Sequence, residues 1–175
     1  MSPTQEGDVP NPRHLAVIYF CFYSATSLLV TFWPHYMTSL GMDSADIGIV
    51  FGVGTIVGIF AQPTLTALSD YVGRPGRALQ VLSIATLALM LGIPFVTGFL
   101  GMAILLWVSA IPRSAIVPLL DATTIRSFGD ARYGTLRVWG SLGYGATAAV
   151  FGLMAQDLPY ETAGTYSVWA YLALA

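Results

Sequence analysis

Two charged residues stand in apolar surroundings, and their types and spacing could support chemistry inside a membrane. Asp121 follows an apolar run that ends at Leu120, and Arg137 lies within "YGTLRVWGSLGYG", which is otherwise small or uncharged. Charged side chains are costly in lipid, usually face a protein interior or a water-filled cavity, and mark a functional site by default. An acid and a base at equal depth can also neutralise each other. Asp121 and Arg137 are therefore the first candidates for a functional site.

A polar face extends from Arg137 if this stretch is helical. The same face continues through Gly140 and Ser141 to Tyr144, nearly two turns further on. It offers a guanidinium, a hydroxyl, backbone exposed by glycine and an aromatic ring, a set that suits a polar organic solute. We therefore expect Asp121, Arg137, Ser141 and Tyr144 to bind a small-molecule substrate. The alternative is a static ion pair that only clamps two helices together.

The composition indicates that the solvent around these residues is lipid. Of the 175 residues, 55% are hydrophobic and only 9% are charged, and the mean hydropathy is +0.70. Soluble domains carry about a quarter charged residues. We therefore expect an all-α integral membrane protein whose length is counted in spans. Cys21, the only cysteine, lies in an apolar run, which excludes an intrachain disulfide and suggests a buried apolar side chain.

The apolar segments predict a helical bundle that follows a disordered cytoplasmic tail at residues 1–14. The expected spans are residues 15–36, 47–69, 78–99, 101–124 and 133–155, with a sixth and incomplete segment at 164–175. Asp43 and Asp46 mark a helix start, and the weak breaker "TGFLG" separates the third span from the fourth. Twelve helical residues cover roughly 18 Å of a hydrocarbon core about 30 Å thick. The sequence is therefore expected to be the N-terminal piece of a longer chain.

The spans must position the two charged candidates. If residues 101–124 and 133–155 form an antiparallel hairpin that turns near Gly129, Asp121 and Arg137 each lie eight residues from the turn. Both would then be about 12 Å from it, at equal depth on adjacent helices. Arg113 lies near mid-membrane without an obvious partner in this chain. We expect Arg113 to serve in coupling or in an interhelical contact, with a partner in a missing half.

The remaining basic residues predict the orientation of the chain. The sequence contains no lysine, and five of its seven arginines fall in the tail or in alternate loops, whereas the other loops contain none. The five are Arg13, Arg74, Arg77, Arg126 and Arg132. Because cytoplasmic loops are enriched in basic residues, this pattern predicts a cytoplasmic N-terminus in the cell (inner) membrane.

The stretch "TALSDYVGRPGRAL" (residues 66–79) resembles the cytoplasmic signature of the major facilitator superfamily, G-x-x-x-D-R/K-x-G-R-R/K. Asp70, Gly73 and Arg74 match it. The departures from the pattern are Thr66, Tyr71 and Pro75. In addition, "DIGIVFGVGTIVGIFAQPTLTALSD" is similar to the second helix of the lactose permease and phenylpropionate permease branch, and "YGTLRVWGSLGYG" resembles its fifth helix.

This resemblance implies a transporter of twelve helices in two halves, of which this chain is the N-terminal six-helix half. It implies a secondary active transporter that moves a sugar, nucleoside or aromatic acid by alternating access, coupled to protons and without a cofactor. By similarity, Arg137 matches the sugar-binding arginine of the fifth helix, and Asp121 matches the acid of the fourth if two loop residues are deleted. Tyr144 stands where that permease has a tryptophan stacked on the sugar. Asp70, Gly73 and Arg74 would govern the inward-facing gate.

Two other classes compete with a transporter. An enzyme would need a nucleophile with a base, a metal cluster or haem ligands inside the spans, but the only histidines, His14 and His35, lie near opposite faces of the first span. We therefore expect no enzyme, no metal site and no cofactor, and the lack of a basic patch argues against nucleic acid as a partner. A non-transporting truncated membrane module or assembly partner remains the alternative.

The transporter reading also makes a prediction about uptake. Replacement of Arg137 should abolish uptake, whereas replacement of Arg126 should leave it nearly intact.

Overall fold

The computed structural model describes residues 11–155, 159, 162 and 165–170. These residues contain helices and no strand, which confirms the all-α class. Five of the helices, counting α4 together with η1, are long and apolar enough to cross a membrane. In chain order the elements are α1 (Pro12–Thr31), α2 (Trp33–Ser39), α3 (Ser44–Val72), α4 (Pro75–Met90), the 3-10 helix η1 (Ile93–Phe95), α5 (Phe99–Phe128) and α6 (Asp130–Ala155).

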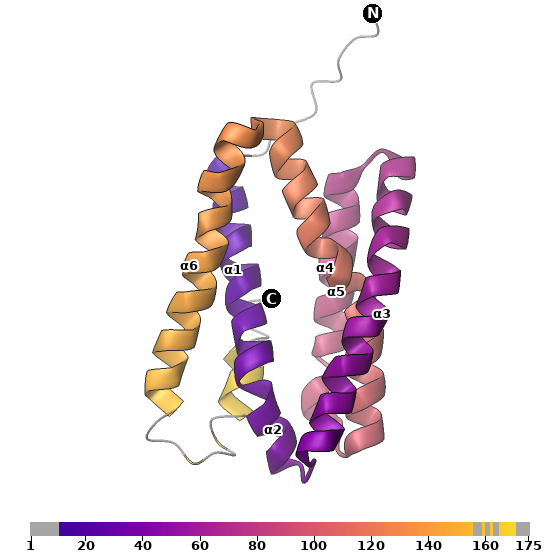
Figure 1. The fold of residues 1–175 in the computed structure, drawn as a ribbon, viewed down its shortest axis with the longest axis vertical. Coiled ribbons are helices and arrows are strands. Elements are labelled where there is room, and N and C mark those ends of the chain that lie inside the picture. The colour runs from indigo at the N-terminus through magenta and orange to yellow at the C-terminus, as the bar shows by residue number, and fades with distance from the viewer. Residues whose placement is uncertain (1–10, 156–158, 160–161, 163–164, 171–175) are drawn as a thin grey trace, which may run out of the picture.

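The long helices run up and down the long axis of the molecule (Figure 1). Helix α1 packs along α6, while α3 and α4 both pack against α5. The start of α1, the junction of α3 with α4 and the turn from α5 to α6 lie at one end, at the top of the view. The five arginines that indicated orientation belong to these three regions, so they gather at one end of the bundle.

Two apolar clusters hold the helices together. The larger one surrounds Leu28, Trp33 and Met37 and includes Met90 of α4 and Met102 of α5. The smaller one joins α1 to α5 and α6 near the turn between these two helices, and its buried residues are Leu15, Tyr19, Leu120 and Leu136. Because α1 supplies residues to both clusters and packs along α6, it connects α6 to the other helices.

The first helix differs from its expected range at both ends. It begins at Pro12, where the Asn11 side chain accepts a hydrogen bond of 2.9 Å from the Arg13 N–H, so residues 12–14 are helical and not part of a tail. It ends at Thr31, and the separate helix α2 follows. Pro34 explains this break, because proline lacks the N–H that an uninterrupted helix would need and its ring clashes with the preceding turn.

Helix α3, which corresponds to the second expected span, begins where its cap was expected, since Asp43 Oδ1 accepts a hydrogen bond of 2.8 Å from the Asp46 N–H. Helix α4 corresponds to the third expected span, residues 78–99, but it already ends at Met90. Residues 93–95 around Pro94 form a separate 3-10 turn. Gly98, with φ +87°, then precedes α5 at the predicted breaker. Of the sixth segment, residues 165–170 are helical, and the remainder of 164–175 lies outside the described residues.

Candidate functional site

The α5–α6 hairpin brings the two charged candidates together. Helix α5 ends at Phe128, α6 begins at Asp130, and Gly129 between them has φ +72°, a left-handed conformation that glycine adopts without steric cost. Arg137 Nε lies 3.8 Å from Asp121 Oδ1, with 32% and 24% of the respective side chains exposed. The predicted ion pair between adjacent helices is therefore present. Its two members are half-buried rather than sealed inside the bundle.

Helix α1 adds a phenol to this pair. The hydroxyl of Tyr19 donates a hydrogen bond of 2.6 Å to Asp121 Oδ1 and lies 3.3 Å from Thr124 Oγ1. Tyr19 is fully buried, and a buried carboxylate gains from each donor that faces it. The Asp121 carboxylate is thus held from two helices, by a phenol of α1 and by the guanidinium of α6.

A second tyrosine of α1 supports the guanidinium. The Cζ atom of Arg137 lies 4.3 Å from the centroid of the Tyr23 ring and 5.8 Å from that of Tyr19, both within cation–π range. Gly140 makes room for this arrangement, because a Cβ there would lie 2.7 Å from Cδ2 of Tyr23 and 3.1 Å from Nη1 of Arg137. We call Tyr19, Tyr23, Asp121, Thr124 and Arg137 the Asp121–Arg137 cluster.

The cluster depends on a close approach of α1 and α6. A Cβ at Gly143 would collide with the carbonyl oxygen of Phe20 and would lie 2.9 Å from Oγ of Ser24. Small residues on one face allow helices in a membrane to pack backbone against backbone. The small residues of α6 thus bring its backbone close enough to α1 for Arg137 to reach the tyrosine rings.

A cavity of about 350 Å³ lies next to the cluster, between α1, α3 and α5. Tyr23 belongs to both, and Arg113 lines the cavity wall on α5. Arg113 precedes Asp121 by eight residues, or about 12 Å along the helix. The sequence offered no obvious partner for Arg113, but the structure gives it an interaction; a partner in a missing half stays a prediction. The described polar groups therefore extend from the cluster toward the middle of α5.

The other two predicted substrate ligands are not drawn into the cluster. Ser141 is exposed and Tyr144 is half-buried, and no hydrogen bond or ion pair of either side chain occurs within the described residues. Their role stays a prediction. Conversely, sequence reasoning missed Tyr19, Tyr23 and Thr124. The available signal was the spacing of the tyrosines, which stand four residues apart and so share one face of the first span.

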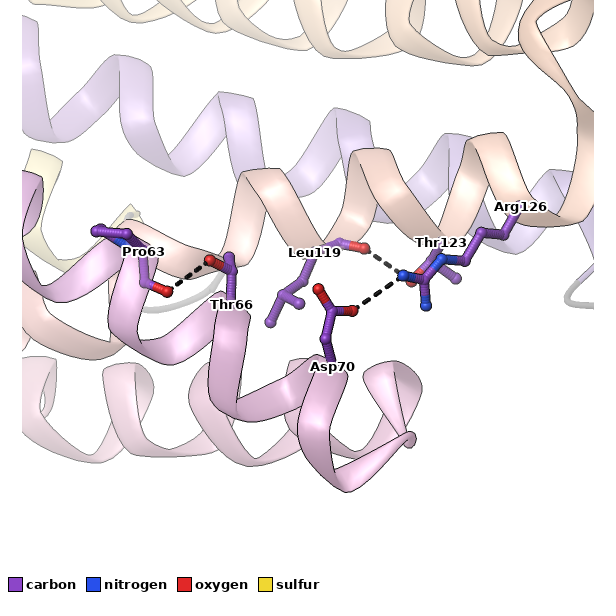
Figure 2. A network of polar contacts seen from close by, with 6 residues as sticks. All are labelled: Pro63, Thr66, Asp70, Leu119, Thr123 and Arg126. Atoms are coloured by element: carbon purple, nitrogen blue, oxygen red, sulfur yellow. Dashed lines mark hydrogen bonds and ion pairs between the residues drawn. The ribbon is translucent and has the colours of Figure 1, made fainter.

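The signature residues Asp70 and Gly73 make specific contacts at the arginine-rich end of the bundle. Gly73 caps α3 with φ +68°, and its N–H bonds to the carbonyls of Ser69 and Asp70. The Arg126 guanidinium of α5 donates a hydrogen bond of 2.9 Å to Asp70 Oδ1, as Figure 2 shows. Both side chains are more than half exposed, at 58% for Arg126 and 59% for Asp70. In the sequence Arg126 was counted only as a charge of a cytoplasmic loop, but in the structure it binds Asp70 of the signature.

The signature position occupied by Thr66 instead of glycine is accommodated within α3. Its hydroxyl bonds to the carbonyl oxygens of Gln62 at 2.9 Å and Pro63 at 3.1 Å, and Figure 2 shows it one turn before Asp70. A hydroxyl that donates to a carbonyl oxygen of its own helix needs no hydrogen-bond partner on another helix. Arg74, also predicted from the signature, is exposed at the start of α4.

Comparison with known proteins assigns the family. The profile of the family described as "MFS_1 like family" matches residues 13–175. The chain is 27% identical over 152 residues to the uncharacterized transporter YwbF of Bacillus subtilis (strain 168), which covers 83% of the chain and 38% of the relative. It is 24% identical over 157 residues to the probable 3-phenylpropionic acid transporter of Escherichia coli (strain K12), covering 85% and 40%.

A third relative, the maltose permease of Geobacillus stearothermophilus, is 28% identical over 156 residues, covering 85% of the chain and 38% of the relative. The chain thus spans about two fifths of the length of these relatives. No solved structure matches it. All three relatives are named as transporters or permeases. Because the profile covers nearly the whole sequence, the chain belongs to the MFS_1-like family of the major facilitator superfamily.

Proposed function

We propose that this chain is the N-terminal helical bundle of a secondary active transporter for a small organic solute. In this proposal the solute binds at the Asp121–Arg137 cluster and in the adjacent cavity, and a second bundle supplies the opposite wall. The two bundles then rock around the solute, the repeat logic known for this superfamily. The arginine-rich end faces the cytoplasm of the cell (inner) membrane, and transport is coupled to protons.

The state of the Arg137 guanidinium carries this proposal. It is half-buried on a membrane-spanning helix, between the Asp121 carboxylate and the Tyr23 ring. Its distance of 3.8 Å from Asp121 exceeds hydrogen-bond reach. A guanidinium has five N–H donors, so the contact with Asp121 does not saturate it. A group held in position with donors to spare is suited to bind a solute oxygen.

The signature loop supports the same reading at the arginine-rich end of the bundle. The ion pair of Asp70 with Arg126 joins α3 to α5 there, and Arg126 lies five residues, or about 7.5 Å along α5, beyond Asp121. Exposed pairs contribute about 0–1 kcal/mol, which is small enough to break and reform during a transport cycle. We therefore assign Asp70, Gly73 and Arg74 to the gate and not to solute contact.

Uptake by the complete gene product tests the proposal. Cells expressing wild type, Arg137→Ala or Arg132→Ala receive labelled maltose, 3-phenylpropionate and a nucleoside in turn. Arg132 is the matched control because it is an exposed arginine on the same helix, whereas Arg126 pairs with Asp70. Arg137→Ala is expected to abolish uptake and Arg132→Ala to retain it. Equal losses at equal expression would contradict the assignment of Arg137.

A further inference from the structure

A groove between α3 and α4 lies at the arginine-rich end of the bundle. Both helices pack against α5, on the side of the molecule away from α6 (Figure 1). The groove has a volume of about 330 Å³ and shares no lining residue with the cavity beside Tyr23. Its lining residues are Leu65, Leu68, Ser69 and Val72 of α3, Arg74 at the cap of α4, and Arg77, Ala78, Val81 and Leu82 of α4.

The spacing of these residues places them on two facing helix stripes. Those of α3 follow one another at intervals of three, one and three residues, and those of α4 repeat this pattern from Arg74 onward. Residues three and four apart share one face of a helix. The two arginines stand next to the α3–α4 junction, whereas Val81 and Leu82 begin one turn beyond Arg77. The groove is thus cationic at its mouth and apolar along its length.

The charge of the two arginines is not balanced within the described part of the chain. Both side chains are exposed, and neither makes a hydrogen bond or an ion pair with a described residue. Asp70 is the nearest acid in sequence, but its carboxylate bonds to Arg126 of α5. None of the described lining residues is an acid. The mouth of the groove therefore has two uncompensated positive charges.

Hydrogen-bond donors without partners accompany these charges. Ser69 is 4% exposed, lines the groove, and has an Oγ atom that bonds to no other described group. The cap of α4 has no side-chain hydrogen bond, and no described backbone bond uses the amides of Gly76 and Arg77. A buried hydroxyl without a partner is costly, and amides in the first turn of a helix attract anions. An anion with several oxygens would accept hydrogen bonds from these donors.

The apolar stripes favour a phospholipid over a small soluble anion. Val72 and Val81 are 59% and 64% exposed, so both present apolar area to whatever fills the groove. A free phosphate would contact the arginines and leave this area bare. The stripe from Leu65 to Val72 extends about 10.5 Å along α3, which is most of the roughly 15 Å depth of one leaflet. Basic pockets between membrane helices on the cytoplasmic side bind anionic headgroups.

We propose that this groove binds an anionic phospholipid of the cytoplasmic leaflet. Its phosphate lies against Arg74 and Arg77, and one acyl chain lies between the apolar stripes of α3 and α4. This site goes beyond the proposed function, because it requires neither the solute nor the Asp121–Arg137 cluster. It also places a lipid beside the signature loop, since Arg74 belongs to both.

Native mass spectrometry of the purified complete gene product in detergent tests the proposal. Dioleoyl phosphatidylglycerol and dioleoyl phosphatidylcholine are titrated in turn, because their chains are identical and only the first has a net negative charge. The dissociation constant of the first bound lipid is compared. Wild type should bind the anionic lipid roughly 5- to 25-fold more tightly, since each arginine near a membrane surface contributes about fivefold.

Variants at Arg77 locate the headgroup, because Arg77 has no part in the proposed gate. Arg77→Gln should weaken binding of the anionic lipid about fivefold, and Arg77→Lys should retain it. Arg132→Gln is the matched control, since Arg132 is an exposed arginine of α6 at the same end of the bundle, and it should leave binding unchanged. Equal losses for Arg77→Gln and Arg132→Gln would indicate diffuse attraction to a basic surface and would overturn the site.

Two further measurements locate the acyl chain. Ala78→Phe fills the groove and should weaken binding of both lipids, with the melting temperature as a check that this variant folds. Glycerol 3-phosphate, which has a phosphate and no chain, should fail to displace the anionic lipid at millimolar concentration. Displacement by it would mean a site for soluble phosphate. Equal affinity of wild type for the two lipids, or no bound lipid because a second bundle or a second copy covers the groove, would also overturn the proposal.

Discussion

Tyr19 and Arg137 face the same oxygen atom of Asp121. The phenol donates to Asp121 Oδ1 at 2.6 Å, and Arg137 Nε lies 3.8 Å from that atom. Asp121 therefore has its shorter and stronger contact with α1, although its ionic partner stands on α6. The orientation of the carboxylate depends on Tyr19, and the charge balance depends on Arg137.

Replacing Tyr19 with phenylalanine should lower the stability of the bundle. The change removes one hydroxyl that bonds to a charged group, a contact typically contributing about 1.5–3 kcal/mol. The melting temperature of the purified protein in detergent measures the effect. Tyr71→Phe is the control, because Tyr71 is 90% exposed, and it should melt like wild type. A Tyr19→Phe protein with unchanged melting would mean that the hydrogen bond contributes nothing to folding.

Joint replacement of Asp121 and Arg137 by leucine should separate folding from function. An apolar pair can replace an ion pair without loss of stability, whereas removal of one partner leaves a costly charge. The double variant also loses the Tyr19–Asp121 hydrogen bond, so it should melt below wild type but above Arg137→Leu alone, and it should still fail in uptake. Arg137→Leu alone should be destabilised by about 3–5 kcal/mol. Normal uptake by the double variant would indicate a static clamp, and uptake by neither wild type nor variant would favour the non-transporting module.

Adding a methyl group at Gly143 should force α1 and α6 apart. Gly143→Ala places a Cβ against the Phe20 carbonyl, and overpacking of this kind costs about 1–3 kcal/mol. Gly145→Ala is the matched control, since nothing lies within 4 Å of a Cβ there, and helix propensity favours alanine over glycine by about 1 kcal/mol. Thermal unfolding should thus shift in opposite directions for the two variants. A shift in the same direction would refute the close packing.

The pair formed by Asp70 and Arg126 should affect the transport rate more than folding. Asp70→Asn and Arg126→Ala each remove an exposed ion pair, which changes stability by about 1 kcal/mol or less. If the pair belongs to the gate, both variants should retain solute binding and show the same reduction in uptake rate. Titration of the solute into the purified protein measures binding, and the initial rate of uptake measures transport. Loss of binding in a folded Asp70→Asn protein would place Asp70 in the solute site.

The hairpin part of the site was predictable from the sequence, and the α1 part was not. Asp121 and Arg137 lie on consecutive helices joined by a short turn, so counting residues from Gly129 was enough to place them at the same depth. Tyr19 reaches Asp121 across a separation of 102 residues. Such a contact depends on how α1 packs against helices far away in the chain. The spacing of Tyr19 and Tyr23 shows that they share one face of α1, but it does not show which helix that face meets.

The helix ends were predictable where a residue acts on its own backbone. Asp43 caps α3 and Gly98 precedes α5, both close to the expected positions. Hydropathy overestimated the first and third spans, because apolar residues continue past the points where Pro34 and Pro94 interrupt regular helical hydrogen bonding. The contact of Arg126 with Asp70 was not predictable, because a charge count over the loops cannot reveal a partner on another helix.

The single-residue turn at Gly129 makes chain length itself a determinant of the site. Because only Gly129 connects α5 to α6, the position of one helix along the other is fixed. Asp121 and Arg137 each lie eight residues from Gly129, so they stay at the same level. One extra residue at the start of α6 would rotate the helix by about 100° and advance it by about 1.5 Å. Arg137 would then point away from Asp121, so an insertion of one residue at the start of α6 is expected to separate the acid from the base.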